Sequence, residues 1–306
     1  MLTRMGVLVV GSVALDTVET LEGKVEDSLG GSATYFSVAA SFFHQQIHLV
    51  GVVGDDFPSE YVDFLSKRGI DLQGLERITG GKTFRWGGSY VSDLNAAETE
   101  FTYLNVFSDF DPKLPYTYQD TPYVFLANIN PELQLRVLEQ VHRPKLVVCD
   151  TMNLWIDISR PALMETLKQV DILILNDGEA KQLTEKKNLI QAGKEILTYG
   201  PSRVVIKKGE HWAISLTKSE FFAVPAYPLT SVFDPTGAGD SFAGGFMGYL
   251  AAQNRSNDEQ TIRQAIVYGT VVASFNVEDF SLNRQRTLTR QEIDDRFNRL
   301  KDMVHF

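Results

Sequence analysis

The sequence predicts an α/β protein with a doubly wound, mostly parallel sheet flanked by helices. Two observations carry this prediction: short apolar runs alternate with helical patterns, and the runs are continuously hydrophobic. Continuous runs are typical of strands that helices cover on both faces, and strand–helix alternation builds doubly wound sheets. The predicted strands are Val7–Val10, Ile47–Val53, Tyr123–Leu126, Leu146–Cys149, Ile172–Leu175 and Val204–Lys207.

Between these strands, apolar residues recur at helical spacing. Ala33, Phe36 and Ala40 fall on one helical face, and a further pattern stops at Gly69. After Leu216 the pattern becomes strand once more, and only helices are expected beyond it. The remaining predicted helices are Leu133–Val141, Leu163–Val170, Glu179–Leu183, Leu189–Tyr199, Ser241–Gln253, Glu259–Phe275 and Arg290–Met303.

Two segments interrupt the alternation. Residues 15–29 and 83–105 are polar, strand-like and rich in turn residues, and Asp93-Leu94-Asn95 indicates a turn between two antiparallel strands. These segments are expected either to form a small separate sheet or to decorate an edge of the large one. The chain is otherwise expected to be a single domain over residues 1–306.

The composition is that of an ordinary globular protein, with 43% hydrophobic and 22% charged residues. The formal net charge of −10 argues against nucleic acids and anionic membranes as partners, because both attract basic proteins. The single cysteine, Cys149, lies in an apolar run and is expected to be buried, which fits a reducing cytoplasm. No window of the sequence approaches the ~20 apolar residues of a membrane helix.

The segment Asp234–Leu250 is the most informative for function. Gly237 and Gly239 permit a tight turn, and an apolar helical pattern starts near Ala238. A turn that leads into a helix leaves backbone N–H groups unpaired, and together with the helix dipole these form an anion site. Asp240 lies in that site, where its charge would repel a phosphate. It is therefore expected either to cap the helix or to take a proton from an attacking hydroxyl.

The run Asp-Pro-Thr-Gly-Ala-Gly-Asp-Ser-Phe at residues 234–242 resembles the C-terminal signature of the PfkB family of carbohydrate kinases, also called ribokinase-like. The resemblance implies that Asp240 is the catalytic base and that the amides of Gly237, Ala238 and Gly239 hold the transferring phosphoryl group. It also implies the ribokinase-like fold, in which a small β-sheet lid covers the substrate and often mediates dimerisation, here of a homodimer. ATP and Mg²⁺ are then the expected donor and metal, and many members also use a monovalent cation.

A second signature, Gly30-Gly31-Ser32-Ala33-Thr34-Tyr35 followed by Val50–Phe57, is similar to the N-terminal signature of the same family. There, paired glycines open a helix beneath the substrate, so Gly30, Gly31 and Tyr35 are predicted to bind the acceptor. Tyr35 stands where the family often has an asparagine that contacts sugar hydroxyls, which argues against a simple hexose. Asp16 corresponds to a family aspartate that binds substrate hydroxyls, and otherwise it would only end the first strand.

The nucleotide site implied by the resemblance lies at the ends of later strands. Asn176 and Glu179 match the family's Asn-x-x-Glu motif, which would bind phosphates and, through water, Mg²⁺; the same spacing also fits a capping box. Lys207 is predicted to pair with a phosphate, and Gly209 to let the nucleotide approach the backbone. Asn276 lies where the family contacts adenine and, in many members, the monovalent cation.

These features predict an ATP-dependent phosphotransferase that acts on a primary hydroxyl of a small ribose-containing substrate. Aromatic residues of the predicted lid favour a nucleoside by stacking on its base, although they would equally suit the lid's own core or a dimer interface. The first alternative is a sugar kinase acting on ribose, fructose or a similar sugar. The two lid segments disfavour a kinase for vitamin-like hydroxymethyl compounds, and Asp240 disfavours a non-catalytic nucleotide- or sugar-binding regulator. The aromatic residues are Phe84, Trp86, Tyr90, Phe101 and Tyr103, with Tyr35 beneath them.

Overall fold

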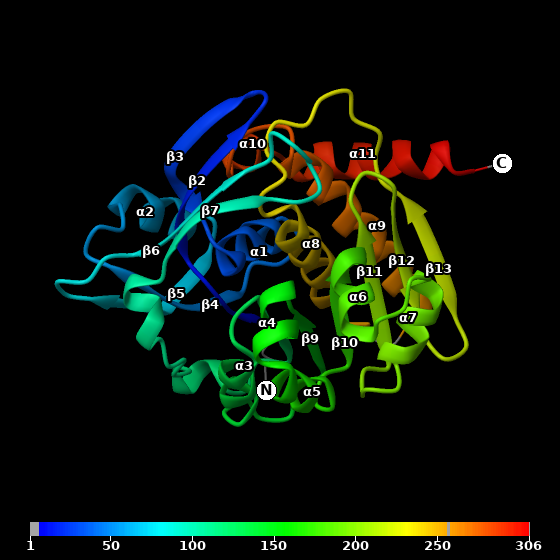
Figure 1. Cartoon of the computed structure of the whole chain (residues 1–306), viewed down its shortest axis with the longest axis horizontal. Coiled ribbons are helices and arrows are strands. Elements are labelled where there is room, and N and C mark those ends of the chain that lie inside the picture. The colour runs from blue at the N-terminus through cyan, green and yellow to red at the C-terminus, as the bar shows by residue number, and fades with distance from the viewer. Residues whose placement is uncertain (1–5, 256–257, 306) are drawn as a thin grey trace.

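The computed structural model describes residues 6–255 and 258–305, and the strands in this part of the chain form two separate sheets (Figure 1). The strands of the larger sheet are β1 (Val7–Val10), β4 (Ile47–Gly54), β5 (Ile70–Ile78), β8 (Tyr123–Leu126), β9 (Leu146–Asp150), β10 (Ile172–Asn176), β11 (Arg203–Lys208), β12 (Trp212–Leu216) and β13 (Phe221–Pro225). Their order is β13-β12-β11-β10-β9-β8-β1-β4-β5. Neighbours from β11 to β5 in this order run parallel, whereas β12 and β13 are antiparallel additions at one edge.

Helices cover both faces of this sheet, because successive side chains of a strand point to opposite faces. In β1, Val7 and Val9 belong to one buried cluster, and Leu8 and Val10 belong to another. The first cluster is covered by α1 (Ser32–Ser41), α2 (Ser59–Lys67), α8 (Ala238–Gln253), α9 (Glu259–Asn276) and α11 (Arg290–Met303). The second is covered by α3 (Pro131–Leu138), α4 (Asn153–Ile158), α5 (Arg160–Leu167), α6 (Asp177–Thr184) and α7 (Leu189–Ile196). The short helices are η1 (Asn105–Asp109), η2 (Tyr116–Tyr118) and α10 (Asn283–Thr287).

The smaller sheet lies at one side of the molecule, at the upper left of Figure 1. Its strands, in spatial order, are β3 (Gly23–Gly30), β2 (Ala14–Thr20), β6 (Phe84–Ser89) and β7 (Glu98–Tyr103). β2 and β6 pair in parallel with Asp16 opposite Trp86, so these two side chains share one face. Alternate residues of β2 from Ala14 to Thr20 are buried, which makes this face the inner one. Tyr103, with 56% of its side chain exposed, lies on the outer face.

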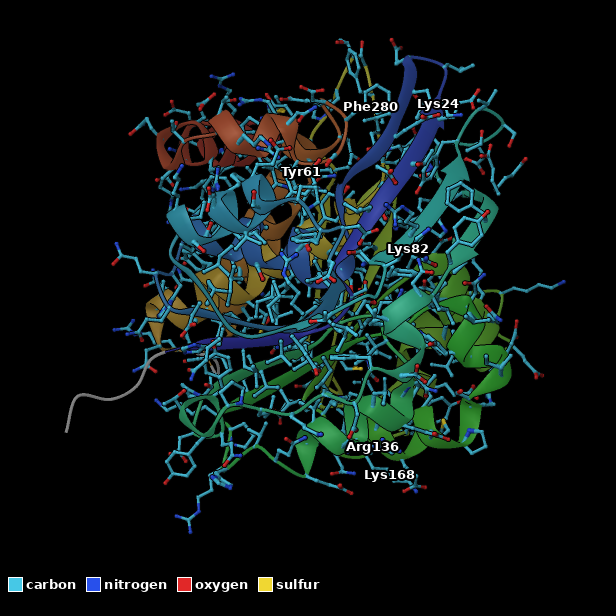
Figure 2. The ribbon with its side chains drawn as sticks, turned by 90° about the vertical axis from the view of Figure 1, so that its left-hand side faces the viewer. Lys24, Tyr61, Lys82, Arg136, Lys168 and Phe280 are labelled. Atoms are coloured by element: carbon cyan, nitrogen blue, oxygen red, sulfur yellow. The ribbon has the colours of Figure 1, made fainter. Side chains whose placement is uncertain are left out.

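The tip of the β2–β3 hairpin rests on the segment that follows α9. The ring of Phe280 lies beside Gly23, at the turn between the two strands, and Figure 2 shows it next to this hairpin. The small sheet therefore touches the main body at the hairpin tip as well as at its base.

The predicted architecture is confirmed. Every strand predicted for the core is present with its ends within one residue, and the two polar segments form the separate small sheet. β5 was not predicted, because it is an edge strand in which exposed polar residues such as Asp71 and Glu76 interrupt the apolar run. In the part of the chain that the structure describes, no helix has both the length and the hydrophobicity needed to cross a bilayer.

Candidate active site

Polar side chains gather where β9, β10 and β11 end and where α8 begins. Because these strands are parallel neighbours, their carboxyl ends meet at one edge of the sheet, and Asn176 pairs in register with Lys207. The start of α8 reaches the same edge, because a Cβ at Gly239, in its first turn, would lie 2.7 Å from the Lys207 Nζ. Figure 1 shows α1 and α8 side by side beneath the small sheet.

The chain enters α8 through a tight turn over Pro235–Ala238. The Ala238 amide donates to the Pro235 carbonyl at 3.2 Å, and Gly237 has φ 73° and ψ 2°, the values of the third residue in a type II turn. The amides of Gly237 and Gly239 have no hydrogen-bond partner among the described residues. The predicted anion site is therefore wrong for Ala238, whose amide closes the turn, and its free donors are those of Gly237 and Gly239.

The buried ring of Tyr35 packs against this turn. A Cβ at Gly237 would collide with the Tyr35 ring, and the tyrosine side chain is only 1% exposed. The Tyr35 ring is thus buried against the turn, and a contact between Tyr35 and the acceptor stays a prediction. The aromatic residue thus sets the position of the turn.

Asp240 lies in the first turn of α8 and is half-buried. Burial raises the pKa of Asp240 to about 7, and the charge of Asp150 adds to this rise, while Lys207 and the backbone N–H of Asp240 itself oppose it. A carboxylate with a pKa near neutrality both exists in its ionised form and accepts a proton readily, as a general base requires.

Lys207 is the cation of this site. A Cβ at Gly239 would lie 2.7 Å from the Lys207 Nζ, and the same Nζ lies 3.7 Å from Asp150 Oδ2. Burial disfavours the ammonium group, but the carboxylates of Asp150, Glu179 and Asp240 outweigh this effect and raise the pKa of Lys207. Lys207 therefore stays charged beside the free amide of Gly239, where a phosphate oxygen would need it.

Asn176 and Glu179 form the capping box at the start of α6. The Glu179 amide donates to Asn176 Oδ1 at 2.8 Å, and the Asn176 amide donates to Glu179 Oε2 at 2.7 Å. Burial and the charge of Asp150 raise the pKa of Glu179. The capping alternative is thus confirmed, and it aims the Glu179 carboxylate toward Asp150, Lys207 and Asp240.

This carboxylate-rich edge fits a hydrated magnesium ion. Three carboxyl groups, those of Asp150, Glu179 and Asp240, lie near the single ammonium of Lys207, and their raised pKa values indicate that a further cation is needed to keep all three ionised. Among the described residues, no group of three or more histidine, cysteine or acidic side chains is arranged to chelate a metal directly. Mg²⁺ commonly keeps several waters and contacts one or two carboxylates together with substrate phosphates, which matches such a layout.

Asp16, on β2, lies beside the start of α1. Its carboxylate sits against Gly30, is 4% exposed, and receives a hydrogen bond from the Gly31 backbone. Burial raises the pKa of Asp16 to about 8, and the charges of Asp234 and Asp240 add to the rise. The Gly30–Gly31 pair and Asp16 therefore lie together, within electrostatic reach of Asp240.

The loop between β6 and β7 crosses from the small sheet to the main body. Thr236 Oγ1 donates to the Tyr90 hydroxyl at 3.4 Å, and a Cβ at Gly209 would collide with Asn95 Oδ1. Gly209 itself has φ 45°, so this backbone suits glycine. The loop thus touches both the Pro235–Ala238 turn and the segment around Gly209, which local sequence patterns did not indicate.

The predicted nucleotide contact of Asn276 is wrong. Its side chain is 0% exposed, and its Nδ2 donates to the Thr236 carbonyl at 2.7 Å. Asp234 was also overlooked: its carboxylate accepts from the amides of Thr236 at 2.8 Å and Ser281 at 2.9 Å. Asn276 and Asp234 therefore both hold the turn from the side that faces the protein interior. The aspartate that opens the signature was the only sequence signal for this support.

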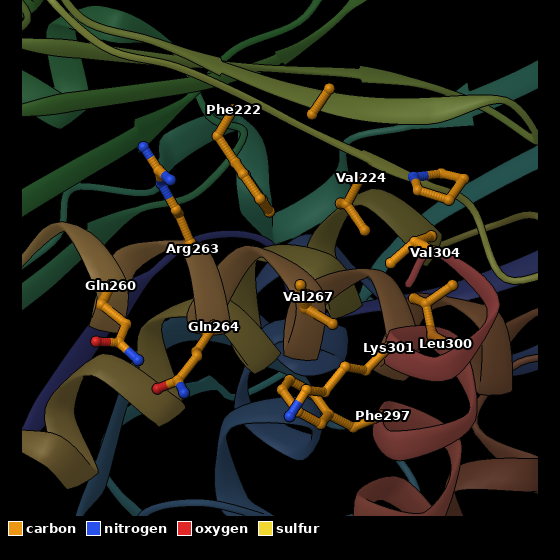
Figure 3. Close-up of a pocket in the computed structure, with 12 residues that line it drawn as sticks. Phe222, Val224, Gln260, Arg263, Gln264, Val267, Phe297, Leu300, Lys301 and Val304 are labelled. Carbon is orange, nitrogen blue, oxygen red and sulfur yellow. The ribbon is translucent and has the colours of Figure 1, made fainter. Parts of the chain in front are cut away.

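A groove of about 320 Å³ lies elsewhere, between β13, α9 and α11 (Figure 3). Its walls are mostly apolar, including Val224, Val267 and Leu300. Among the described residues that line it, there is neither an acid nor any predicted site residue. The groove therefore does not share the chemistry of the α8 site.

The chain is similar in sequence and in fold to several known proteins. The family model for pfkB family carbohydrate kinases matches residues 6–287. The cytidine kinase of Thermococcus kodakarensis is 30% identical over 249 residues, which cover 79% of this chain and 87% of that protein. The structure of Burkholderia thailandensis nucleoside kinase in complex with inosine has a TM-score of 0.76 at 20% identity, covering 96% of this chain and 98% of that one. A structure from E. coli described as a ribokinase II with ATP and Mg²⁺ has a TM-score of 0.79 at 18% identity and covers 96% and 99%.

Proposed function

Because the chain belongs to the PfkB family of carbohydrate kinases and is thus a phosphotransferase, we propose that it transfers the γ-phosphoryl group of ATP to a primary hydroxyl of a nucleoside. The observation that carries the proposal is Asp240, a half-buried carboxylate with a pKa of about 7, placed beside the free amides of Gly237 and Gly239. A base and an anion site at one point are what hydroxyl-to-phosphate transfer needs.

In the proposed reaction, the acceptor hydroxyl lies between Asp16 and Asp240. Asp240 takes the hydroxyl proton as the oxygen forms its bond to the γ-phosphorus, and the bond to the bridging oxygen breaks to release ADP. The amides of Gly237 and Gly239 and the ammonium of Lys207 hold the charge on the phosphoryl oxygens. Catalysis is then mostly positioning and electrostatic stabilisation.

ATP, the phosphoryl donor, would bind at the carboxyl edge of the large sheet. Lys207 and the segment around Gly209 would bind the nucleotide, with Asn176 and Glu179 beside them. Mg²⁺ would be held through water by Glu179 and would neutralise charge on the ATP phosphates. The use of a monovalent cation stays a prediction, which rates measured in potassium and in tetramethylammonium salts would check.

A nucleoside is favoured because Trp86 lies on the inner face of the small sheet, in register with Asp16. Asp16 suits ribose hydroxyls, and an indole face next to it suits a planar base. Two of the other lid aromatics already stack on neighbouring rings. The ring centroids of Phe84 and Phe107 lie 5.2 Å apart, and those of Phe101 and Tyr103 lie 4.9 Å apart. The cytidine kinase and the inosine-bound nucleoside kinase named above support the same substrate class.

The small sheet would act as the lid over this acceptor, closing it from water that would otherwise hydrolyse ATP. Homodimerisation through this lid also stays a prediction, to be checked by light scattering. We place the enzyme in the cytoplasm, where ATP is available and where the buried thiol of Cys149 stays reduced.

A coupled ADP-release assay tests the proposed function. Cytidine, inosine, adenosine and guanosine are compared with ribose and fructose at saturating ATP and Mg²⁺. The highest kcat/KM is expected with a nucleoside. Turnover confined to ribose or fructose would establish the sugar-kinase alternative, and ATP binding without turnover of any acceptor would favour the regulator.

Replacing Trp86 with alanine is expected to raise KM for the nucleoside by roughly ten- to a hundredfold, because base–aromatic stacking contributes about 1–3 kcal/mol. KM for ATP should stay within about twofold. Tyr103→Ala, on the outer face of the same sheet, is the matched control and should leave both values unchanged. Equal effects of the two substitutions on KM for the nucleoside would show that Trp86 does not contact the acceptor.

A further inference from the structure

Three completely buried polar side chains meet beneath the phosphate-binding turn. They are Ser241 on α8, Asn276 at the end of α9 and Gln285 on α10, each 0% exposed. Burying polar groups costs free energy unless they are hydrogen-bonded, so such a cluster needs a structural reason. The hydrogen bond that the Asn276 side-chain amide donates to the turn provides this reason.

The cluster fixes which way the Asn276 amide points. Gln285 Nε2 donates to Asn276 Oδ1 at 2.8 Å, and Ser241 Oγ lies 3.1 Å from the same oxygen. Gln285 Nε2 also donates to Ser241 Oγ at 2.8 Å. With its oxygen held by these partners, Asn276 presents Nδ2 to the Thr236 carbonyl at 2.7 Å.

This one hydrogen bond determines the direction of a donor in the anion site. Thr236 and Gly237 share a peptide unit, and in a trans peptide the C=O and N–H point in opposite directions. A carbonyl held toward Asn276 therefore turns the Gly237 N–H to the opposite side, where it has no partner among the described residues. A flip of this peptide would instead place an oxygen where a phosphoryl group must bind.

We propose that Asn276 is a positioning residue, which holds the Thr236–Gly237 peptide in the orientation that binds the transferring phosphoryl group. Gln285 and Ser241 act on it in turn by fixing the amide. The inference rests on the proposed kinase function, and it adds a specific device: a buried amide, not the turn alone, keeps the Gly237 donor aimed at the phosphate.

The test replaces Asn276 with leucine, which keeps the branched shape of the side chain and removes its donor and its acceptor. We expect kcat to fall by about ten- to a hundredfold, up to the loss seen when a donor to a developing charge is removed. KM for ATP and for the nucleoside should change less than about threefold, because most ground-state contacts remain. Gln285→Leu, which frees the amide to rotate, should reduce kcat in the same direction by a smaller factor.

Ser274→Ala is the matched control. Ser274 is buried on the same helix, and its Oγ donates to Val271 and accepts from Arg296, with no contact to the turn. It should lower the melting temperature without lowering kcat. A substitution at Asn276 that acts only through the fold would behave like this control, and kcat within twofold of wild type for Asn276→Leu would overturn the proposal.

A binding measurement separates this inference from the kinase proposal. Inorganic phosphate should raise the melting temperature of the wild type and of Ser274→Ala, since a ligand that binds only the folded state stabilises it. The shift should be lost in Asn276→Leu and reduced in Gln285→Leu. An unchanged phosphate shift in both variants refutes the positioning role, whatever acceptor the enzyme uses. If Asn276→Leu does not fold, Gln285→Leu decides the question by the same two readouts.

Discussion

Asp240→Asn is expected to lower kcat by about 10²–10⁴-fold, the contribution of a positioned general base. Asparagine has nearly the same shape but cannot take the hydroxyl proton. ATP should still bind with a Kd close to that of the wild type, because Lys207 and the free amides of Gly237 and Gly239 remain. Isothermal titration with ATP and single-turnover kinetics measure the two effects separately.

The pH dependence of the wild-type enzyme follows from the same residue. Only ionised Asp240 accepts a proton, and burial raises its pKa to about 7. With ATP and acceptor saturating, kcat should therefore rise with pH up to about 7 and then level off, falling about tenfold per pH unit on the acid side. The residual activity of Asp240→Asn should lack this acid limb.

Asp63→Asn is the control for Asp240→Asn, since Asp63 is an exposed carboxylate on α2, outside the site. It should match the wild type in kcat and in its pH profile. Asp240→Asn should melt no lower than the wild type, because it removes a charge that Asp150 opposes in a buried setting. An Asp240→Asn enzyme that keeps more than a tenth of wild-type kcat would exclude Asp240 as the base.

Gly237→Ala is expected to lower kcat by at least about a hundredfold, as when a donor to a developing charge is lost. Gly237 has φ 73°, which costs an alanine backbone strain, and the added Cβ would collide with the Tyr35 ring. The turn must then move, and the free amides move with it. Kinetics with the accepted nucleoside measure the loss.

Gly80→Ala separates the collision from the strain. Gly80 has φ 75°, nearly the same backbone conformation, but a Cβ there would meet nothing within 4 Å. Both substitutions should therefore lose a similar amount of stability to strain, and only Gly237→Ala should lose activity. Comparable activity losses in the two variants would show that the turn beside Tyr35 is not part of the catalytic machinery.

The sequence predicted those parts of the site that depend on local chain geometry. A glycine turn that leads into an apolar helix leaves backbone amides unpaired because of its local geometry, which the sequence shows directly. Asp240 is part of the same segment. Glu179 and Asn176 could be read as a capping box because both partners lie within one helical turn. The end of a parallel strand defines its edge of the sheet, and Lys207 lies at that edge in register with Asn176.

The errors concern residues whose role is set by distant segments. The packing of the Tyr35 ring on Gly237, just before α8, was not predicted. Asn276 was assigned to the nucleotide, but α8 and α10 bury it. The contact between Asn95 and Gly209 joins two loops that no local pattern relates. Side-chain environments of this kind depend on tertiary packing, which periodicity does not encode.

A crystal structure with the preferred nucleoside and a non-hydrolysable ATP analogue would test the central claim most directly. The account predicts that the primary hydroxyl oxygen lies within about 2.6–3.2 Å of a carboxylate oxygen of Asp240, the reach of a general base. It also predicts that the Gly237 and Gly239 amides point at the γ-phosphate. A hydroxyl bound out of reach of Asp240, or a γ-phosphate held away from these amides, would contradict it.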